Sequence, residues 1–296
     1  PDINPEARAQ ELALHARHDA LSDAEREELA ALLAAWFVSG IIIAGSGFLA
    51  KVLGKKVLIA DAMGEVADQV FGLPPGELTT SLAWLGVAAY ALQIYFDFSA
   101  YSDIAIGLDL LFGFTFPENF NRPYSAVSIT DFWRRWHMTL GRWFKDYLYI
   151  PLGGNRRGTA RTCLNMTIVC VLCGLWHGAN WTFLFWGMYH GAFLVIERIS
   201  GLRDLALNQF LFIRRFATLI IVVVGWVLFR SENISQAIEF LTAMFTFSDL
   251  PITYELSRAL NYRNVLFVLV AVPVFFLPAD VSLIQLIVNR KDPLPV

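Results

Sequence analysis

The chain has 296 residues, of which 56% are hydrophobic and only 17% are charged, and its formal net charge is −3. Soluble domains carry more charge and less apolar residue content, so this composition excludes an ordinary soluble globular protein. The balanced charge also gives no reason to expect a nucleic-acid partner.

The apolar residues are gathered into windows that follow a polar start. We interpret residues 1–28 as a polar connecting segment and residues 29–296 as one membrane domain. Several windows approach the ~20 residues needed to span a bilayer. The sequence therefore predicts an all-α integral membrane protein with about seven membrane-embedded helices plus interfacial amphipathic helices. The windows are 29–50, 82–97, 163–176, 183–196, 210–229 and 265–277.

Two carboxylates, Asp97 and Asp103, stand among aromatic and hydroxyl side chains at the end of the second window. A buried carboxylate needs a partner, so structural pairing, for example with arginines of the following loop, is the simplest interpretation. Orienting a histidine or relaying protons are the alternatives.

The segment 114–161 is rich in basic residues, which predicts a cytoplasmic location. Asn121 and Arg122 lie in an irregular stretch between Pro117 and Pro123. The glycine-rich basic turn at 153–158 lacks the spacing of a nucleotide-binding loop, so an ordinary turn is favoured over a phosphate site. The mainly acidic span 231–262 falls on the opposite side of the membrane.

Within that segment, the residues from Ser128 to Asp131 fit a capping box and predict the start of an amphipathic helix that runs through residue 148. Aromatic residues share one face, while Arg134 and Arg135 lie on the other, as in a helix at a membrane interface. His137 falls on the apolar side. It is either a space-filling imidazole bonded to a carbonyl or a functional group that points into the protein.

His177 follows an apolar run, and an ionisable residue at membrane depth favours a functional role. A neutral imidazole could take a proton from a hydroxyl as that oxygen attacks a thioester. Asn180, an indole N–H such as that of Trp176, or His137 could then donate to the oxyanion. The alternative is a structural histidine that bonds across helices. Glycines one helical turn apart near both windows allow close helix approach.

A metal site is the weaker interpretation of the same run. Cys170, Cys173 and His177 follow a C-x2-C-x3-H spacing, but a structural zinc site usually needs a fourth ligand, and none is evident. A buried thiol in apolar surroundings is unreactive, which argues against a cysteine acyl-enzyme. We therefore predict no metal.

Four motifs together resemble the bacterial polysaccharide branch of the membrane-bound O-acyltransferase family, over about residues 49–245. They are the runs at 117–124, 131–137, 147–155 and 174–181, namely PENFNRPY, DFWRRWH, YLYIPLGGN and GLWHGANW. The resemblance implies a multi-pass protein of the bacterial cytoplasmic membrane, with its helices arranged in a ring around a central tunnel. It assigns catalysis to His177 and a second family position to His137.

The resemblance further implies transfer of an acetyl or other acyl group from a cytoplasmic thioester, acetyl-CoA or an acyl carrier, with no bound cofactor. The acceptor would be an exported or cell-surface polysaccharide or an extracytoplasmic relay protein. The arginine-bearing face with Arg134 and Arg135 would dock the anionic donor. The helices that precede this region in the family are expected to be missing here. The competing interpretation is a non-catalytic conduit or proton-coupled transporter that uses its buried histidines as a relay.

Overall fold

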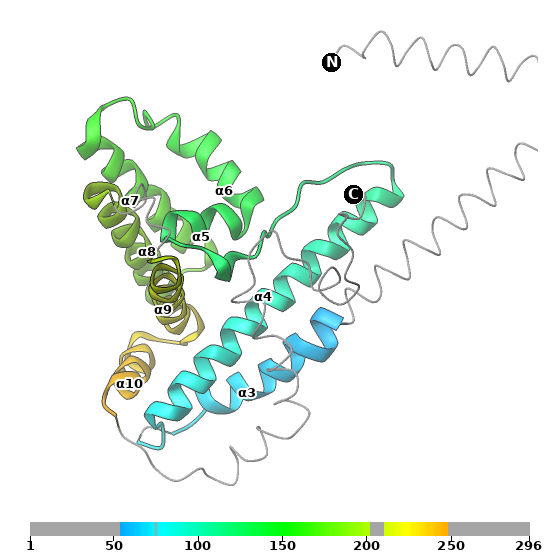
Figure 1. The fold of residues 1–296 in the computed structure, drawn as a ribbon, viewed down its shortest axis with the longest axis vertical. Coiled ribbons are helices and arrows are strands. Elements are labelled where there is room, and N and C mark those ends of the chain that lie inside the picture. Colours follow the sequence, from blue (N-terminus) through cyan, green and yellow to red (C-terminus); the bar gives the residue numbers. More distant parts are fainter. Residues whose placement is uncertain (1–53, 75, 202–209, 248–296) are drawn as a thin grey trace, which may run out of the picture. The chain divides into compact units, whose positions relative to one another are not determined.

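A computed structural model describes residues 54–74, 76–201 and 210–247, which form helices joined by turns and contain no strand (Figure 1). All of them belong to one compact unit of the chain. The predicted all-α class is confirmed for these residues. The polar segment 1–28 and the windows 29–50 and 265–277 lie outside them.

The helices, including short π- and 3₁₀-helices marked η, are η1 (Gly54–Ala60), α3 (Asp61–Phe71), α4 (Thr80–Leu111), η2 (Pro123–Ser125), α5 (Ile129–Arg135), α6 (Met138–Phe144), η3 (Lys145–Tyr149), α7 (Gly158–His177), α8 (Trp181–Ser200), α9 (Leu211–Arg230) and α10 (Ile234–Phe245).

The other four apolar windows lie almost wholly within helices α4, α7, α8 and α9. Two of the described helices, α7 and α9, are long and apolar enough to cross a membrane. In α7 only 17% of the most apolar stretch is buried within the described part of the chain. Large apolar side chains therefore face outward, as expected for a helix in contact with lipid.

Helices α7 and α8 form a tight antiparallel pair, in which His177 ends α7 and His190 lies in the middle of α8. Gly174 and Gly187 face each other, and a Cβ on Gly187 would collide with the carbonyl of Cys170. The turn between the helices closes at Asn180, whose side-chain oxygen accepts a hydrogen bond from the backbone N–H of Thr182 at the start of α8. The glycines thus allow the close backbone approach that the sequence predicted.

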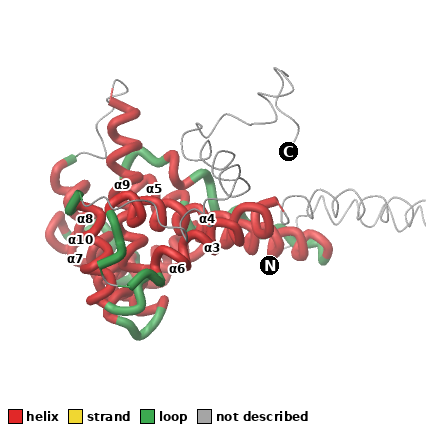
Figure 2. The backbone as a smooth tube through the Cα atoms, turned by 90° about the horizontal axis from the view of Figure 1, so that it is seen from below, coloured by secondary structure: helices red, strands yellow, loops and turns green. Residues whose placement is uncertain are grey.

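The predicted single amphipathic helix from Ser128 through residue 148 is wrong, because it is interrupted between α5 and α6, which Figure 2 labels as separate helices. Helix α5 ends at Arg135 and α6 begins at Met138, and His137 between them has a left-handed backbone with φ 47° and ψ 52°. This conformation costs a non-glycine residue ~1–2 kcal/mol. The break turns the side chain of Trp136 into the aromatic core, where it is 4% exposed.

The predicted apolar face divides at the same break. Phe132 and Phe144 are buried as expected, but Trp143 and Tyr147 are 53% and 70% exposed. Since α6 and η3 no longer continue the axis of α5, the helical period does not keep these aromatics on one buried stripe. Their exposed rings remain suited to a membrane interface.

Candidate active site

The three histidines His137, His177 and His190 line one cavity of about 200 Å³. Helices α5 and α6 form one wall, and α7 and α8 form the other. The remaining lining is mainly apolar or aromatic, with Lys145 and Tyr149 as the other polar contributors of note. The predicted pair His137 and His177 is thus brought to a common space, although they are 40 positions apart in the chain.

His137 is held by Asn119, which lies in the irregular stretch before η2. The amide oxygen of Asn119 is 3.1 Å from Nδ1 of His137, and it also accepts hydrogen bonds from the backbone N–H and hydroxyl of Thr139. The Asn119 backbone carbonyl accepts from Met138 N–H. Asn119 therefore caps the first turn of α6 and orients the imidazole at the same time.

These contacts fix which ring nitrogen of His137 carries the proton. A backbone N–H can only donate, so the Asn119 atom that bonds Thr139 is the oxygen, and its amide nitrogen donates to the hydroxyl of Ser102 at 3.0 Å. Facing an amide oxygen, Nδ1 of His137 must donate. In the neutral ring, Nε2 then keeps its lone pair and can accept a proton.

Burial also keeps this ring neutral. It lowers the pKa of His137 from 6.5 to about 4, and the nearby His177 contributes in the same direction. His137 is therefore an uncharged proton acceptor at neutral pH. The expectation that it could donate to an oxyanion does not match the neutral ring, whose N–H is already bonded to Asn119.

His177, the last residue of α7, stands in a cage of aromatic rings. The rings of Trp186 and Phe229 are nearly perpendicular to it, at centroid distances of 5.3 and 5.0 Å. Trp176 is the predicted neighbour, 5.0 Å from His177 and 6.4 Å from His137. Among the described residues, no protein group hydrogen-bonds to the His177 imidazole, and the residue lines the cavity.

His190 is a member of the site that sequence reasoning missed. It lies in the middle of α8, is 2% exposed, and neither ring nitrogen has a hydrogen-bond partner among the described residues. Trp133 and Trp186 pack against it at 5.0 and 5.2 Å. The sequence offered only one hint, a histidine inside an apolar helical window.

Asn180, Asp97 and Asp103 instead make structural contacts. The Asn180 amide nitrogen donates to the carbonyl of Glu232 at 2.8 Å while its oxygen caps α8. Asp97 pairs with Lys56 at 2.7 Å and Asp103 with Lys55 at 2.8 Å. The pairing predicted for the carboxylates is confirmed, but the partners are lysines of η1 rather than loop arginines.

The loop residues fix the break between α5 and α6. The Asn121 backbone N–H donates to the carbonyl of Arg135 at 2.9 Å, and Arg122 has a left-handed backbone with φ 44°. The guanidinium of Arg135 pairs with Asp131 at 2.8 Å, whereas Arg134 is exposed. None of these three arginines lines the cavity.

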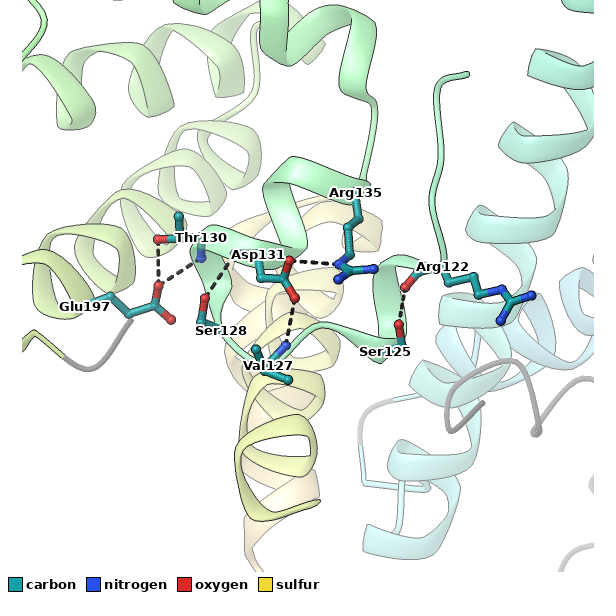
Figure 3. Close-up of polar contacts among 8 residues, drawn as sticks. All are labelled: Arg122, Ser125, Val127, Ser128, Thr130, Asp131, Arg135 and Glu197. Atoms are coloured by element: carbon teal, nitrogen blue, oxygen red, sulfur yellow. Dashed lines mark hydrogen bonds and ion pairs between the residues drawn. The ribbon is translucent and has the colours of Figure 1, made fainter. Parts of the chain in front are cut away.

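Helix α5 is anchored to α8 by Glu197, a second residue that the sequence reasoning did not single out (Figure 3). Its carboxylate accepts hydrogen bonds from the backbone N–H groups of Ile129 and Thr130, the latter at 2.9 Å, and from the Thr130 hydroxyl at 2.8 Å. Ser128 caps the same helix as predicted, accepting from Asp131 N–H. The carboxylate thus holds the start of α5, and with it the wall that contains His137, against α8.

Cys170 and Cys173 also line the cavity as free thiols. The described residues contain no group of three or more histidine, cysteine or acidic side chains arranged to hold a metal ion.

Comparisons with known proteins point to one family. The family described as MBOAT, membrane-bound O-acyltransferase family, matches residues 40–264. The chain is 53% identical over 205 residues to a probable alginate O-acetylase AlgI of Pseudomonas putida, covering 69% of this chain and 41% of the relative. It is 40% identical over 215 residues to a peptidoglycan O-acetyltransferase of Helicobacter pylori, covering 72% and 40%. A teichoic acid D-alanyltransferase of Streptococcus thermophilus is 33% identical over 165 residues, covering 48% and 39%. The chain spans about two fifths of the length of these relatives.

Proposed function

The chain belongs to the membrane-bound O-acyltransferase family, and we propose that it transfers an acetyl or related acyl group from a cytoplasmic thioester. The acceptor is a hydroxyl of an exported or cell-surface polysaccharide, or an extracytoplasmic relay protein. The observation that carries the proposal is the convergence of His137 and His177 on one mainly apolar cavity. The names of the relatives, which describe acyl transfer to alginate, peptidoglycan and teichoic acid, favour a polysaccharide acceptor.

In the proposed reaction, a neutral nitrogen of His177 takes the proton of the acceptor hydroxyl as its oxygen bonds to the thioester carbonyl carbon. The tetrahedral oxyanion then collapses, the C–S bond breaks, and the imidazolium returns its proton to the departing thiolate. The products are the O-acyl ester and the free thiol. A dry, aromatic surrounding favours the neutral base and strengthens each hydrogen bond to the reacting atoms.

His137 has a distinct part in this scheme. Its Nε2 lone pair, fixed by Asn119, makes it a second proton acceptor on the opposite wall of the cavity. Because Asn180 is committed to Glu232 and to the start of α8, an indole N–H is the remaining candidate donor to the oxyanion. Trp176 is 58% exposed and does not line the cavity.

The scaffold proposed around this site is a multi-pass protein of the bacterial cytoplasmic membrane, with about seven embedded helices in residues 29–296 and a tunnel that joins the two sides. The outward-facing apolar surface of α7 supports membrane embedding. The donor is acetyl-CoA or an acyl carrier, and its anionic part meets the basic α6–η3 side, where Lys145 reaches the cavity.

The function is tested with purified protein in lipid vesicles. A radiolabelled acetyl thioester is supplied on one side and a glycan acceptor on the other, and labelled ester is expected on the glycan. Proton flux without any thioester, together with no labelled ester, would instead support a proton-coupled transporter and contradict acyl transfer.

A further inference from the structure

Helix α4 supports the loop that positions His137, and it does so from outside the walls of the cavity. Two hydrogen bonds fasten this loop to the helix. The Asn119 amide nitrogen donates to the hydroxyl of Ser102 at 3.0 Å, and the Tyr124 hydroxyl donates to the carbonyl of Ala91 at 2.6 Å. The two contacts on α4 are about three helical turns apart, so the loop is fixed to one rigid element at two separate points.

The preceding turn of α4 contacts the imidazole itself. Phe98 lies four residues before Ser102, so both side chains project from the same face of the helix. The Phe98 ring is perpendicular to the His137 imidazole, and the ring centroids are 4.7 Å apart. One turn of α4 thus packs against the ring of His137, and the next turn bonds the amide that holds Nδ1 of the same ring.

The proton position on His137 needs such support. In water the neutral histidine side chain prefers to carry its proton on Nε2, whereas the Asn119 oxygen selects the form that is protonated on Nδ1. Ser102 strengthens that selection, because an amide whose N–H is hydrogen-bonded is polarised and its oxygen accepts more strongly. Ser102 and Asn119 are both 8% exposed. Removal of the serine hydroxyl therefore leaves the amide nitrogen buried without its partner.

We propose that Ser102 is a positioning residue for acyl transfer, which acts through Asn119 to keep the proton of His137 on Nδ1 and the lone pair on Nε2. The inference rests on the proposed function, in which His137 is the second proton acceptor. The next residue, Asp103, pairs with Lys55 of η1 at 2.8 Å, which ties the same turn of α4 to a neighbouring element.

A simpler role for Ser102 is to stabilise a buried helix contact, and Ser99 provides the matched comparison. Ser99 is buried on the same helix, and its hydroxyl donates to the carbonyl of Phe96 within that helix at 3.4 Å. Ser99→Ala and Ser102→Ala each remove one buried hydroxyl from α4, but only the second removes the partner of Asn119. A purely structural role predicts similar effects of the two substitutions on His137.

The test is nitrogen NMR of the purified protein in detergent, with isotopically labelled histidine rings. The chain has five histidines, and the signals of His137 are those that disappear in His137→Gln. A ring nitrogen that carries a proton and one that carries a lone pair differ widely in chemical shift, so the spectrum reports the tautomer.

Wild type, Ser99→Ala and Ser102→Thr, which keeps the hydroxyl, should show His137 protonated on Nδ1. In Ser102→Ala the ratio of the Nε2–H form to the Nδ1–H form should rise by about tenfold, the scale of one net hydrogen bond. In acyl transfer, Ser102→Ala should lower kcat by about tenfold with little change in the KM for the thioester, because Ser102 stands outside the cavity.

A wild-type tautomer of His137 in a folded Ser102→Ala protein would overturn the inference, as would an equal change in Ser99→Ala. If Ser102→Ala does not fold, Ser102→Cys gives the same comparison, since its sulfur fills the site but is a weak acceptor. The spectra are recorded without turnover. A tautomer that depends on Ser102 in a protein that transfers no acyl group would therefore contradict only the proposed function. Acyl transfer with a tautomer independent of Ser102 would contradict only the role of Ser102.

Discussion

The amide oxygen of Asn119 lies 3.1 Å from Nδ1 of His137, across the break between α5 and α6. The same oxygen accepts from the Thr139 N–H, and the Asn119 backbone carbonyl accepts from the Met138 N–H, so the geometry of the break and the orientation of the imidazole have one origin. A residue 18 positions upstream thus determines which nitrogen of His137 faces the cavity as an acceptor.

Replacing Asn119 by aspartate should separate its two roles. Aspartate keeps an oxygen that can cap α6 and accept from Nδ1, but its negative charge favours the imidazolium and should raise the pKa of His137. The acid limb of the pH profile for acyl transfer should then move to higher pH. Asn119→Leu should instead lower activity at every pH and destabilise the fold by ~1–3 kcal/mol through unpaired buried donors. An unchanged profile in the aspartate variant would show that His137 takes no part.

Stability should depend on the titration of His137 itself. Its folded pKa is about 4 and its unfolded value is near 6.5, so between these values the unfolded chain binds more protons. Stability should therefore fall as the pH is lowered from about 6.5 toward 4, and His137→Gln should reduce that dependence. The thermal midpoint in detergent, recorded from pH 7 to 4, measures this. Parallel curves for wild type and variant would contradict it.

Glu197→Ala should loosen the wall that carries His137. The substitution leaves two backbone N–H groups and one hydroxyl at the start of α5 without their acceptor, with a cost of ~1–3 kcal/mol or more. We expect a lower thermal midpoint and a loss of acyl transfer that exceeds the loss of folded protein. Glu239→Ala, at an exposed carboxylate of α10, serves as the control and should leave both measurements unchanged.

Lys145→Glu should weaken the binding of an anionic donor more than Arg134→Glu does. Both side chains are exposed, but only Lys145 lines the cavity. The KM for acetyl-CoA should rise by roughly tenfold in the Lys145 variant, with a weaker dependence on salt, because one direct charge contact is lost. The KM for uncharged S-acetyl-pantetheine should stay constant. Equal effects of the two variants on the KM would contradict docking at Lys145 and support docking on the face that bears Arg134 and Arg135.

The sequence predicts the helices of this protein better than their interruptions. The windows that became α4, α7, α8 and α9 are long enough for composition alone to reveal them. No glycine or proline at positions 136 and 137 marks the break in the sequence. The break is instead imposed from outside the helix by hydrogen bonds to the backbone of Asn119 and Asn121. Local periodicity cannot report such a tertiary constraint.

The site residues divide in the same way. His137 and His177 are predictable because an ionisable residue among apolar ones is conspicuous, and the motifs around them are long. His190 meets the first condition but lacks any polar neighbour in sequence, and its significance comes from Trp133, 57 positions away. From the sequence, Glu197 resembles a solvated residue at a helix end. Only the structure shows that its carboxylate accepts a hydrogen bond from Thr130. Both depend on contacts that folding creates.

The most direct test of the account is acyl transfer by His177→Ala. The purified variant is compared with wild type for transfer of labelled acetyl from a thioester to a glycan. The thermal midpoint and the binding of an unreactive thioether analogue of the donor are measured alongside. Loss of a general base predicts a fall of about a hundredfold or more in the rate of transfer, with folding and donor binding retained. Transfer at the wild-type rate by the folded variant would contradict the assignment of His177 as the base.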